Sequence, residues 1–124
     1  MIPKTLEEIA SYIVKDGKGI LAADESTGTI EKRFKSIDVE STEDNRRKYR
    51  EMLFRSPAMA EAIGGVILFD ETLRQKAQDG SYLRDVILNH GSLPGIKVDK
   101  GIKELEDNSN EKITTGLDGL NKRC

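Results

Sequence analysis

The sequence contains no tryptophan, one cysteine and one histidine among its 124 residues. Cys124 has no second cysteine with which to form an intrachain disulfide, which excludes a disulfide-stapled scaffold. The single histidine, His90, together with one terminal thiol gives no set of ligands for a zinc site. With only one cysteine and one histidine, the sequence excludes the zinc-finger class and predicts a protein that holds no metal.

Long hydrophobic runs and an excess of one charge are also missing. The longest apolar run, 66–69, is far shorter than the roughly 20 residues that a membrane-spanning helix needs. The opening Met1–Lys4 lacks the apolar segment of a secretory signal. Twenty basic and 22 acidic residues give a formal charge of -2. We therefore expect a cytoplasmic protein that binds neither a membrane nor nucleic acid.

The sequence does contain an alternation of two apolar patterns. Continuous apolar runs, which are typical of strands buried on both faces, occupy residues 19–23 and 63–69, and residues 94–99 are a third strand candidate. Segments with helical spacing lie between them, and this order predicts βαβ units in an α/β fold with a parallel sheet. Two adjacent glycines in the second run indicate that a backbone or a ligand approaches it closely. Residues 101–112 are expected to form a polar loop, and 114–120 to begin another helix.

The helical segments begin and end at recognisable residues. Thr5 and Glu8 form a capping box before a helix that ends at Gly17, and Thr42 can cap a later one. On that later helix the mixed charges predict an exposed polar face opposite an apolar stripe. The residues of the polar face are Glu43, Arg46, Arg47 and Arg50, and those of the stripe are Tyr49, Met52 and Leu53.

Ligands of parallel α/β sheets bind at the carboxyl ends of the strands, which nominates residues 24–29, 70–71 and 97–100. In the first segment, Ser26 and Thr29 open a helix, and Arg33 follows on the same helical face. Together they could bind an anion, or they could be an ordinary helix cap beside a surface arginine. Asp70 and Glu71 could form a second acidic site, but they are interpreted as ordinary exposed loop acids.

Asp24 and Lys97 are the charged residues at two of these strand ends. Alternation along the strand places Lys97 on the side opposite Ile96 and Val98, where an unpaired ammonium would be costly. Asp24 is its candidate partner. The pair could be a structural ion pair, Asp24 could act as an acid or base, and a desolvated Lys97 could act as a Schiff-base nucleophile.

Five blocks of sequence resemble class I fructose-bisphosphate aldolases, in that family's order and spacing, from about Leu6 to Cys124. The first reads Gly-Ile-Leu-Ala-Ala-Asp-Glu-Ser-Thr-Gly at 19–28. The others are 45–47, then 64–69 with 71–73, then 95–101 and 114–120. The resemblance implies a (β/α)₈ TIM barrel, usually a homotetramer, that cleaves fructose 1,6-bisphosphate to dihydroxyacetone phosphate and glyceraldehyde 3-phosphate. It implies a Schiff base and no cofactor or metal.

The resemblance also implies roles for individual residues. Asp24 matches an active-site aspartate near the Schiff-base lysine, and Lys97 matches a lysine that contacts substrate rather than the Schiff-base former. Ser26, Thr29 and Arg33 match a substrate-phosphate site, with Thr29 in place of a frequent serine. For this segment the resemblance favours the phosphate site over the ordinary helix cap.

The family's Schiff-base lysine and acid/base glutamate lie on later strands, whereas 124 residues supply about three of eight strands. We therefore expect residues 1–124 to be a partial barrel domain, truncated on its C-terminal side. Two alternatives remain at this point. One is a non-catalytic paralogue that acts as a phosphate-binding or interaction module. The other is a free-standing doubly wound domain, which strand order would distinguish from a barrel.

A polypeptide limited to these residues is predicted to be inactive, because it lacks the lysine that would form the Schiff base. It should neither cleave fructose 1,6-bisphosphate nor retain dihydroxyacetone phosphate after borohydride reduction, as measured by aldehyde release and protein mass. Appreciable turnover by the 124-residue polypeptide would contradict this prediction.

Overall fold

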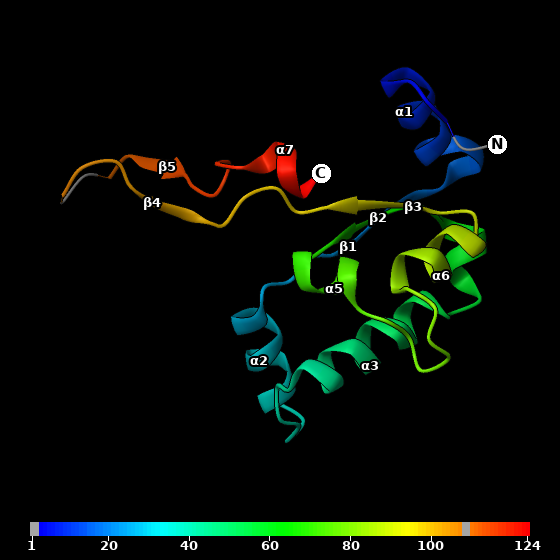
Figure 1. Cartoon of the computed structure of the whole chain (residues 1–124), viewed down its shortest axis with the longest axis horizontal. Coiled ribbons are helices and arrows are strands. Elements are labelled where there is room, and N and C mark those ends of the chain that lie inside the picture. The colour runs from blue at the N-terminus through cyan, green and yellow to red at the C-terminus, as the bar shows by residue number, and fades with distance from the viewer. Residues whose placement is uncertain (1–2, 108–109) are drawn as a thin grey trace.

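A computed structural model describes residues 3–107 and 110–124. Within them, strands β1 (Gly19–Ala23), β2 (Ile63–Leu68) and β3 (Leu93–Ile96) form a parallel sheet in sequential order (Figure 1). Sequential order is that of a barrel segment, whereas a doubly wound sheet reorders its strands. The α/β class and the three parallel strands are confirmed. The third strand ends at Ile96, three residues earlier than predicted.

Helices connect the strands. They are α1 (Leu6–Val14) with the short 3₁₀ turn η1 (Lys15–Gly17), α2 (Thr27–Lys35), α3 (Glu43–Phe54), α4 (Ala58–Ala62), α5 (Asp70–Arg74), α6 (Leu83–Asn89) and α7 (Leu120–Arg123). Of these, α3, α4 and α6 pack over one side of the sheet. Figure 1 shows α3, α5 and α6 on one side of the sheet and α2 near the carboxyl end of β1. In the part of the chain described, no helix is long and apolar enough to cross a membrane.

Both predicted helix caps are present. The Thr5 hydroxyl accepts the Glu8 amide at 3.2 Å, and the Glu8 carboxylate accepts the Thr5 amide at 3.1 Å. The Thr42 hydroxyl likewise accepts the Asn45 amide at 3.1 Å. These bonds satisfy amides that the first helical turn leaves unpaired, so local sequence alone sets where α1 and α3 begin. Met1 and Ile2, part of the opening that lacks a signal pattern, lie outside the described residues.

The hydrophobic core lies between the sheet and the helices that cover it. Ala23, Val66 and Leu68 point to this side. They pack with Phe54, Met59, Leu83, Val86 and Ile87 from α3, α4 and α6. Side chains alternate along a strand, so Ile20 lies on the other face of the sheet, where it is 56% exposed. The sheet is therefore covered on one face and open on the other within the described chain.

The buried face of α3 differs in part from the predicted one. Of the predicted stripe, Leu53 packs against the core and Tyr49 against Phe34. Arg46, Arg50 and Phe54, spaced by four residues, are its buried side chains, whereas Met52 is 63% exposed. Arg46 and Arg50 were predicted to face solvent, and that prediction is wrong. The helix turns its arginines inward because carboxylates from the ends of β1 and β2 meet them there, as the ion pairs below show.

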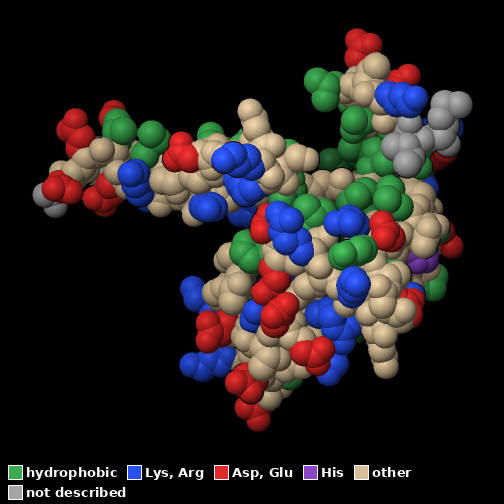
Figure 2. All heavy atoms as spheres, viewed as in Figure 1, with side chains coloured by type: hydrophobic (Ala, Val, Ile, Leu, Met, Phe, Trp, Pro, Cys, Tyr) green, Lys and Arg blue, Asp and Glu red, His purple; other side chains and the backbone are tan. Residues whose placement is uncertain are grey.

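The segment after β3 is a hairpin rather than a loop. Strands β4 (Ile102–Glu104) and β5 (Lys112–Thr114) pair antiparallel, and the helix expected over 114–120 begins only at Leu120. Residues 108–109 of the predicted loop lie outside the described chain. Figure 1 shows the hairpin extending away from the body, and Figure 2 shows acidic side chains toward its tip.

The predicted close approach at the glycines of β2 is confirmed. A Cβ on Gly64 would lie 1.9 Å from the main-chain oxygen of Ile13, and one on Gly65 would touch the Ile13 side chain at 3.3 Å. Only a glycine at position 64 therefore lets α1 pack against the start of β2.

Gly64→Ala should destabilise the whole polypeptide that carries this segment by about 1–3 kcal/mol or more, because α1 must move away from β2. Thermal or urea unfolding measures the change. Gly19→Ala is the matched control, since a Cβ there meets no described atom within 4 Å, and it should change stability by less than about 0.5 kcal/mol. Equal effects of the two substitutions would contradict this account.

Candidate functional site

A pocket of about 720 Å³ lies where the three parallel strands end. Its lining comes from the segments that follow β1, β2 and β3 and from α7. The lining residues are Ser26, Phe69, Asp70, Glu71, Lys97, Asp99, Lys100, Gly101 and Arg123. All three segments nominated from the sequence thus contribute to one site, as expected for a parallel sheet.

Lys97 stands between two carboxylates in this pocket. Its Nζ lies 3.3 Å from Asp24 Oδ2 and 3.3 Å from Asp99 Oδ1, so the predicted Asp24–Lys97 contact is present. Asp99, and after it Asp24, raises the pKa of Lys97 above its usual value. A protonated ammonium is a donor and a point charge but not a nucleophile. The geometry therefore favours an electrostatic role for Lys97 over Schiff-base formation.

Hydrogen bonds to main-chain groups hold the segment that carries Lys97 and Asp99 in place. The Gly101 amide donates to Asp99 Oδ2 at 2.9 Å and, ahead of Lys97, lowers the pKa of the Asp99 carboxyl. Arg123 donates to the carbonyl oxygens of Val98 at 2.7 Å and Gly116 at 2.6 Å. The chain on either side of the hairpin is thereby tied to the strand end that carries Lys97. The same alternation that placed Lys97 could have identified Asp99, two residues later.

The predicted anion-binding residues lie at the start of α2. Ser26 precedes the first helical residue, and its hydroxyl is 3.2 Å from that of Thr29. Arg33 is exposed and forms an ion pair with Glu25, which raises the Arg33 pKa, and it does not line the pocket. Ser26 and Lys97 both line the pocket, and the Thr29 hydroxyl lies next to that of Ser26. The structure thus brings four predicted residues (Asp24, Ser26, Thr29 and Lys97) together, with the guanidinium of Arg33 held aside.

Two buried arginines of α3 support this site from behind. Arg46 forms a bidentate pair with Glu71, with Nε–Oε1 and Nη2–Oε2 distances of 2.9 Å each. Arg50 is fully buried, donates to the Glu25 carbonyl at 2.6 Å and lies 3.6 Å from the Glu25 carboxylate. Burial lowers the pKa of Arg50. Sequence analysis missed these partners and wrongly placed Asp70 and Glu71 in a loop, whereas they begin α5.

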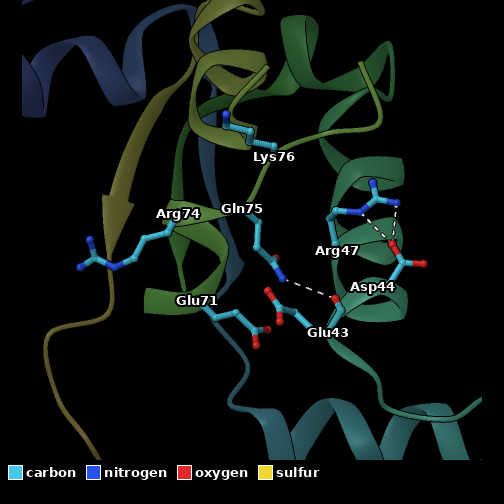
Figure 3. Close-up of a pocket in the computed structure, with 7 residues that line it drawn as sticks. All are labelled: Glu43, Asp44, Arg47, Glu71, Arg74, Gln75 and Lys76. Carbon is cyan, nitrogen blue, oxygen red and sulfur yellow. Dashed lines mark hydrogen bonds and ion pairs between the residues drawn. The ribbon is translucent and has the colours of Figure 1, made fainter. Parts of the chain in front are cut away.

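A second groove, of about 580 Å³, lies between α3 and α5 (Figure 3). Gln75 reaches across it and donates to the Glu43 carbonyl at 3.4 Å, while Arg47 turns back to Asp44 on its own helix. Figure 3 shows Arg74 pointing away from α3. Arg47 pairs with Asp44 and Glu51 of its own helix, Arg74 pairs with Asp70, and Glu71 pairs with Arg46. Because most charges of the groove already have partners, they do not converge on a ligand.

His90 does not line the pocket. It follows the last residue of α6, where its main-chain amide donates to the carbonyl oxygens of Ile87 and Leu88. No group of three or more His, Cys, Asp or Glu side chains suited to a metal ion lies within residues 3–107 and 110–124.

Comparison with known proteins identifies the relatives of this chain. The model of the glycolytic class I fructose-bisphosphate aldolase family matches residues 5–124. Fructose-bisphosphate aldolase 4, cytosolic, of Arabidopsis thaliana is 58% identical over 99% of this chain and 32% of its own length. The cytoplasmic isozyme of Spinacia oleracea is 58% identical over 93% of this chain and 32% of its own. This chain therefore spans about a third of the length of these relatives.

A solved structure agrees with these matches. It is a ternary co-crystal structure of fructose-bisphosphate aldolase from Plasmodium falciparum in complex with TRAP and a small-molecule inhibitor. The TM-score is 0.87 at 49% identity, over 94% of this chain and 33% of that chain. The expected fold, part of a (β/α)₈ barrel, is thereby confirmed.

The lowered pKa of Asp99 predicts a specific pH dependence. A depressed folded-state pKa contributes stability that is present above the unfolded value of about 3.9 and is lost as the pH falls through the folded value. Asp99→Asn should lower the unfolding temperature of the whole polypeptide at pH 7. Calorimetry should show this difference shrinking as the pH falls below about 4. A difference that stays constant down to pH 2 would contradict the assignment.

Proposed function

The chain belongs to the class I fructose-bisphosphate aldolase family, and we propose from this membership that the polypeptide carrying it cleaves fructose 1,6-bisphosphate reversibly to dihydroxyacetone phosphate and glyceraldehyde 3-phosphate. The supporting observation is the convergence of Lys97, Asp24 and Asp99 at the carboxyl ends of β1 and β3. Parallel barrels carry their chemistry at this end of the strands.

Lys97 acts in this proposal as a fixed positive charge for the substrate. Its pKa is raised, so the amine remains an ammonium that can pair with a phosphate or a developing oxyanion. Asp24 and Asp99 hold it in place from two sides. The Asp24 carboxylate, 3.3 Å from Lys97 Nζ, can also accept a hydrogen bond from a substrate hydroxyl.

Ser26, Thr29 and Arg33 form the phosphate site of the proposal. Ser26 and Thr29 present adjacent hydroxyls at the start of α2, where helix amides and the helix dipole favour an anion. Arg33, two helical turns from Ser26, is exposed and can supply a bidentate charge. The spacing of these three residues on a single helix supports one shared phosphate rather than separate sites.

The chemistry itself follows from a Schiff base. A neutral lysine amine adds to the ketone of the sugar phosphate, and water leaves to give a protonated imine. A base takes the proton of the hydroxyl beside the scissile carbon–carbon bond, the aldehyde leaves, and the imine accepts the electron pair to become an enamine. Protonation of the enamine carbon and hydrolysis then release dihydroxyacetone phosphate and the free lysine. Lys97 is unsuited to the addition step, and the family resemblance places the Schiff-base lysine on a later strand. The reaction as proposed needs no metal and no cofactor.

The domain context is part of the same proposal. We propose that residues 1–124 form part of an aldolase barrel domain, in which further strands continue the sheet and enclose its open face, including the exposed Ile20. The resemblance supports a homotetramer. Cytosolic and cytoplasmic names among the relatives support a cytoplasmic location.

Lys97→Gln should lower kcat/KM for fructose 1,6-bisphosphate roughly 100-fold in the whole polypeptide, because the substrate loses a positioned charge. Lys48→Gln, an exposed lysine on α3 outside the pocket, is the control and should stay within about two-fold. Borohydride should still trap dihydroxyacetone phosphate on the Lys97→Gln protein, since the nucleophile is elsewhere.

Three results would overturn the assignment. Loss of trapping with normal folding would make Lys97 itself the nucleophile. Unchanged kcat/KM would remove it from the site. Phosphate-dependent stabilisation of the unaltered polypeptide without cleavage or trapping would favour the non-catalytic binding module instead.

A further inference from the structure

The Glu25 carboxylate lies between two guanidinium groups of different character. One oxygen, Oε1, pairs with the exposed Arg33. The other, Oε2, is buried, lies 3.6 Å from Arg50 Nη2 and makes no hydrogen bond to any described residue. Glu25 is therefore bonded to the exposed arginine while its second oxygen faces the buried one.

Arg50 also has hydrogen-bond donors without partners among the described residues. Its side chain is fully buried and bonds the Glu25 carbonyl oxygen, yet its Nε and Nη1 have no hydrogen-bond partner among the described residues. Buried donors and acceptors without partners are rare because each costs its full desolvation penalty. An orphan acceptor and two orphan donors thus lie on two side chains that are already in ionic contact.

We propose that Glu25 is a positioning residue that hands Arg33 to the substrate phosphate: as Arg33 turns to the phosphate, the Glu25 carboxylate leaves it and bonds the buried guanidinium of Arg50. The inference rests on the proposed phosphate-binding role of Arg33. The main chain need not move, because Arg50 holds the Glu25 carbonyl at 2.6 Å in either state.

The exchange is energetically balanced. Breaking the Arg33–Glu25 pair costs little because Arg33 is 56% exposed, and such pairs change an equilibrium by no more than about five-fold. In the proposed exchange the carboxylate moves closer to the Arg50 guanidinium, whose Nε and Nη1 have no partner among the described residues. Glu25 keeps a counter-charge throughout, and so does Arg50, whose burial would otherwise be costly. Arg33 is therefore held near the site when it is empty and released when an anion arrives.

The test is titration of the whole polypeptide with inorganic phosphate, followed by calorimetry. Glu25→Gln removes the competing carboxylate and should tighten phosphate binding by about two- to five-fold, even though it lowers stability. Glu61→Gln changes the net charge equally on α4, which leads into the opposite end of β2, and should leave phosphate affinity unchanged. Weaker or equal binding in Glu25→Gln would mean that Glu25 only braces the fold, and would overturn the proposal.

Substitution of Arg50, which receives the Glu25 carboxylate, should have the opposite effect on phosphate affinity to that of Glu25→Gln. Arg50→Gln should weaken phosphate binding, because Glu25 then has no other cation to join. The double variant Glu25→Gln with Arg50→Gln should bind phosphate as tightly as Glu25→Gln alone. Additive effects of the two substitutions would contradict the handover.

A measurement on the unaltered protein covers the case in which an Arg50 variant does not fold. The Nε–H resonance of Arg50 should shift downfield in NMR spectra as phosphate is added, because it gains a carboxylate partner. A resonance that stays fixed while phosphate binds would overturn the handover. Arg33→Gln distinguishes failure of the proposed phosphate site from failure of the handover. Unchanged phosphate affinity in Arg33→Gln refutes the phosphate site itself. Weakened affinity in Arg33→Gln, with no tightening in Glu25→Gln, refutes only the handover.

Discussion

Two guanidinium groups buried on α3 need counter-charges, and this requirement ties the structure together. Transfer of an ion out of water is costly unless it is paired and hydrogen bonded. Arg46 finds Glu71 and Arg50 finds Glu25, and these acids follow β2 and β1 respectively. One helix is thereby bound to two strand ends, at the edge of the sheet where the pocket opens.

These ion pairs also hold the neighbouring residues of the pocket in place. Glu25 lies between Asp24 and Ser26, so holding its carbonyl oxygen fixes both neighbours. Glu71 lines the pocket and the groove behind it, and so forms part of the wall between them. On the other side, Arg123 and the Gly101 amide fix the chain around Lys97. Contacts of this kind, made behind the residues that line a pocket, hold those residues in the narrow range of positions that a binding site needs.

Local signals in the sequence were sufficient for much of the fold. Capping side chains set the starts of α1 and α3, and the apolar runs located the three strands, because both effects act between near neighbours. The hairpin of β4 and β5 was missed, since its short strands carry many charges and only their pairing makes them a sheet. The buried arginines were missed for a related reason: charge predicts exposure unless a partner is known.

The sequence by itself determined the α/β class, the family resemblance and the strand ends at which Asp24, Ser26, Thr29 and Lys97 lie, because parallel strands bring their carboxyl ends to one edge. The residue pattern alone left open whether Lys97 is a nucleophile or a cation, and the family resemblance favoured the cation. The tertiary structure supports the same role, because it places Asp24 and Asp99 on either side of Lys97. Only the tertiary structure decided which arginine is exposed and which is buried, because partners 25 residues apart along the chain are chosen by packing and not by local pattern.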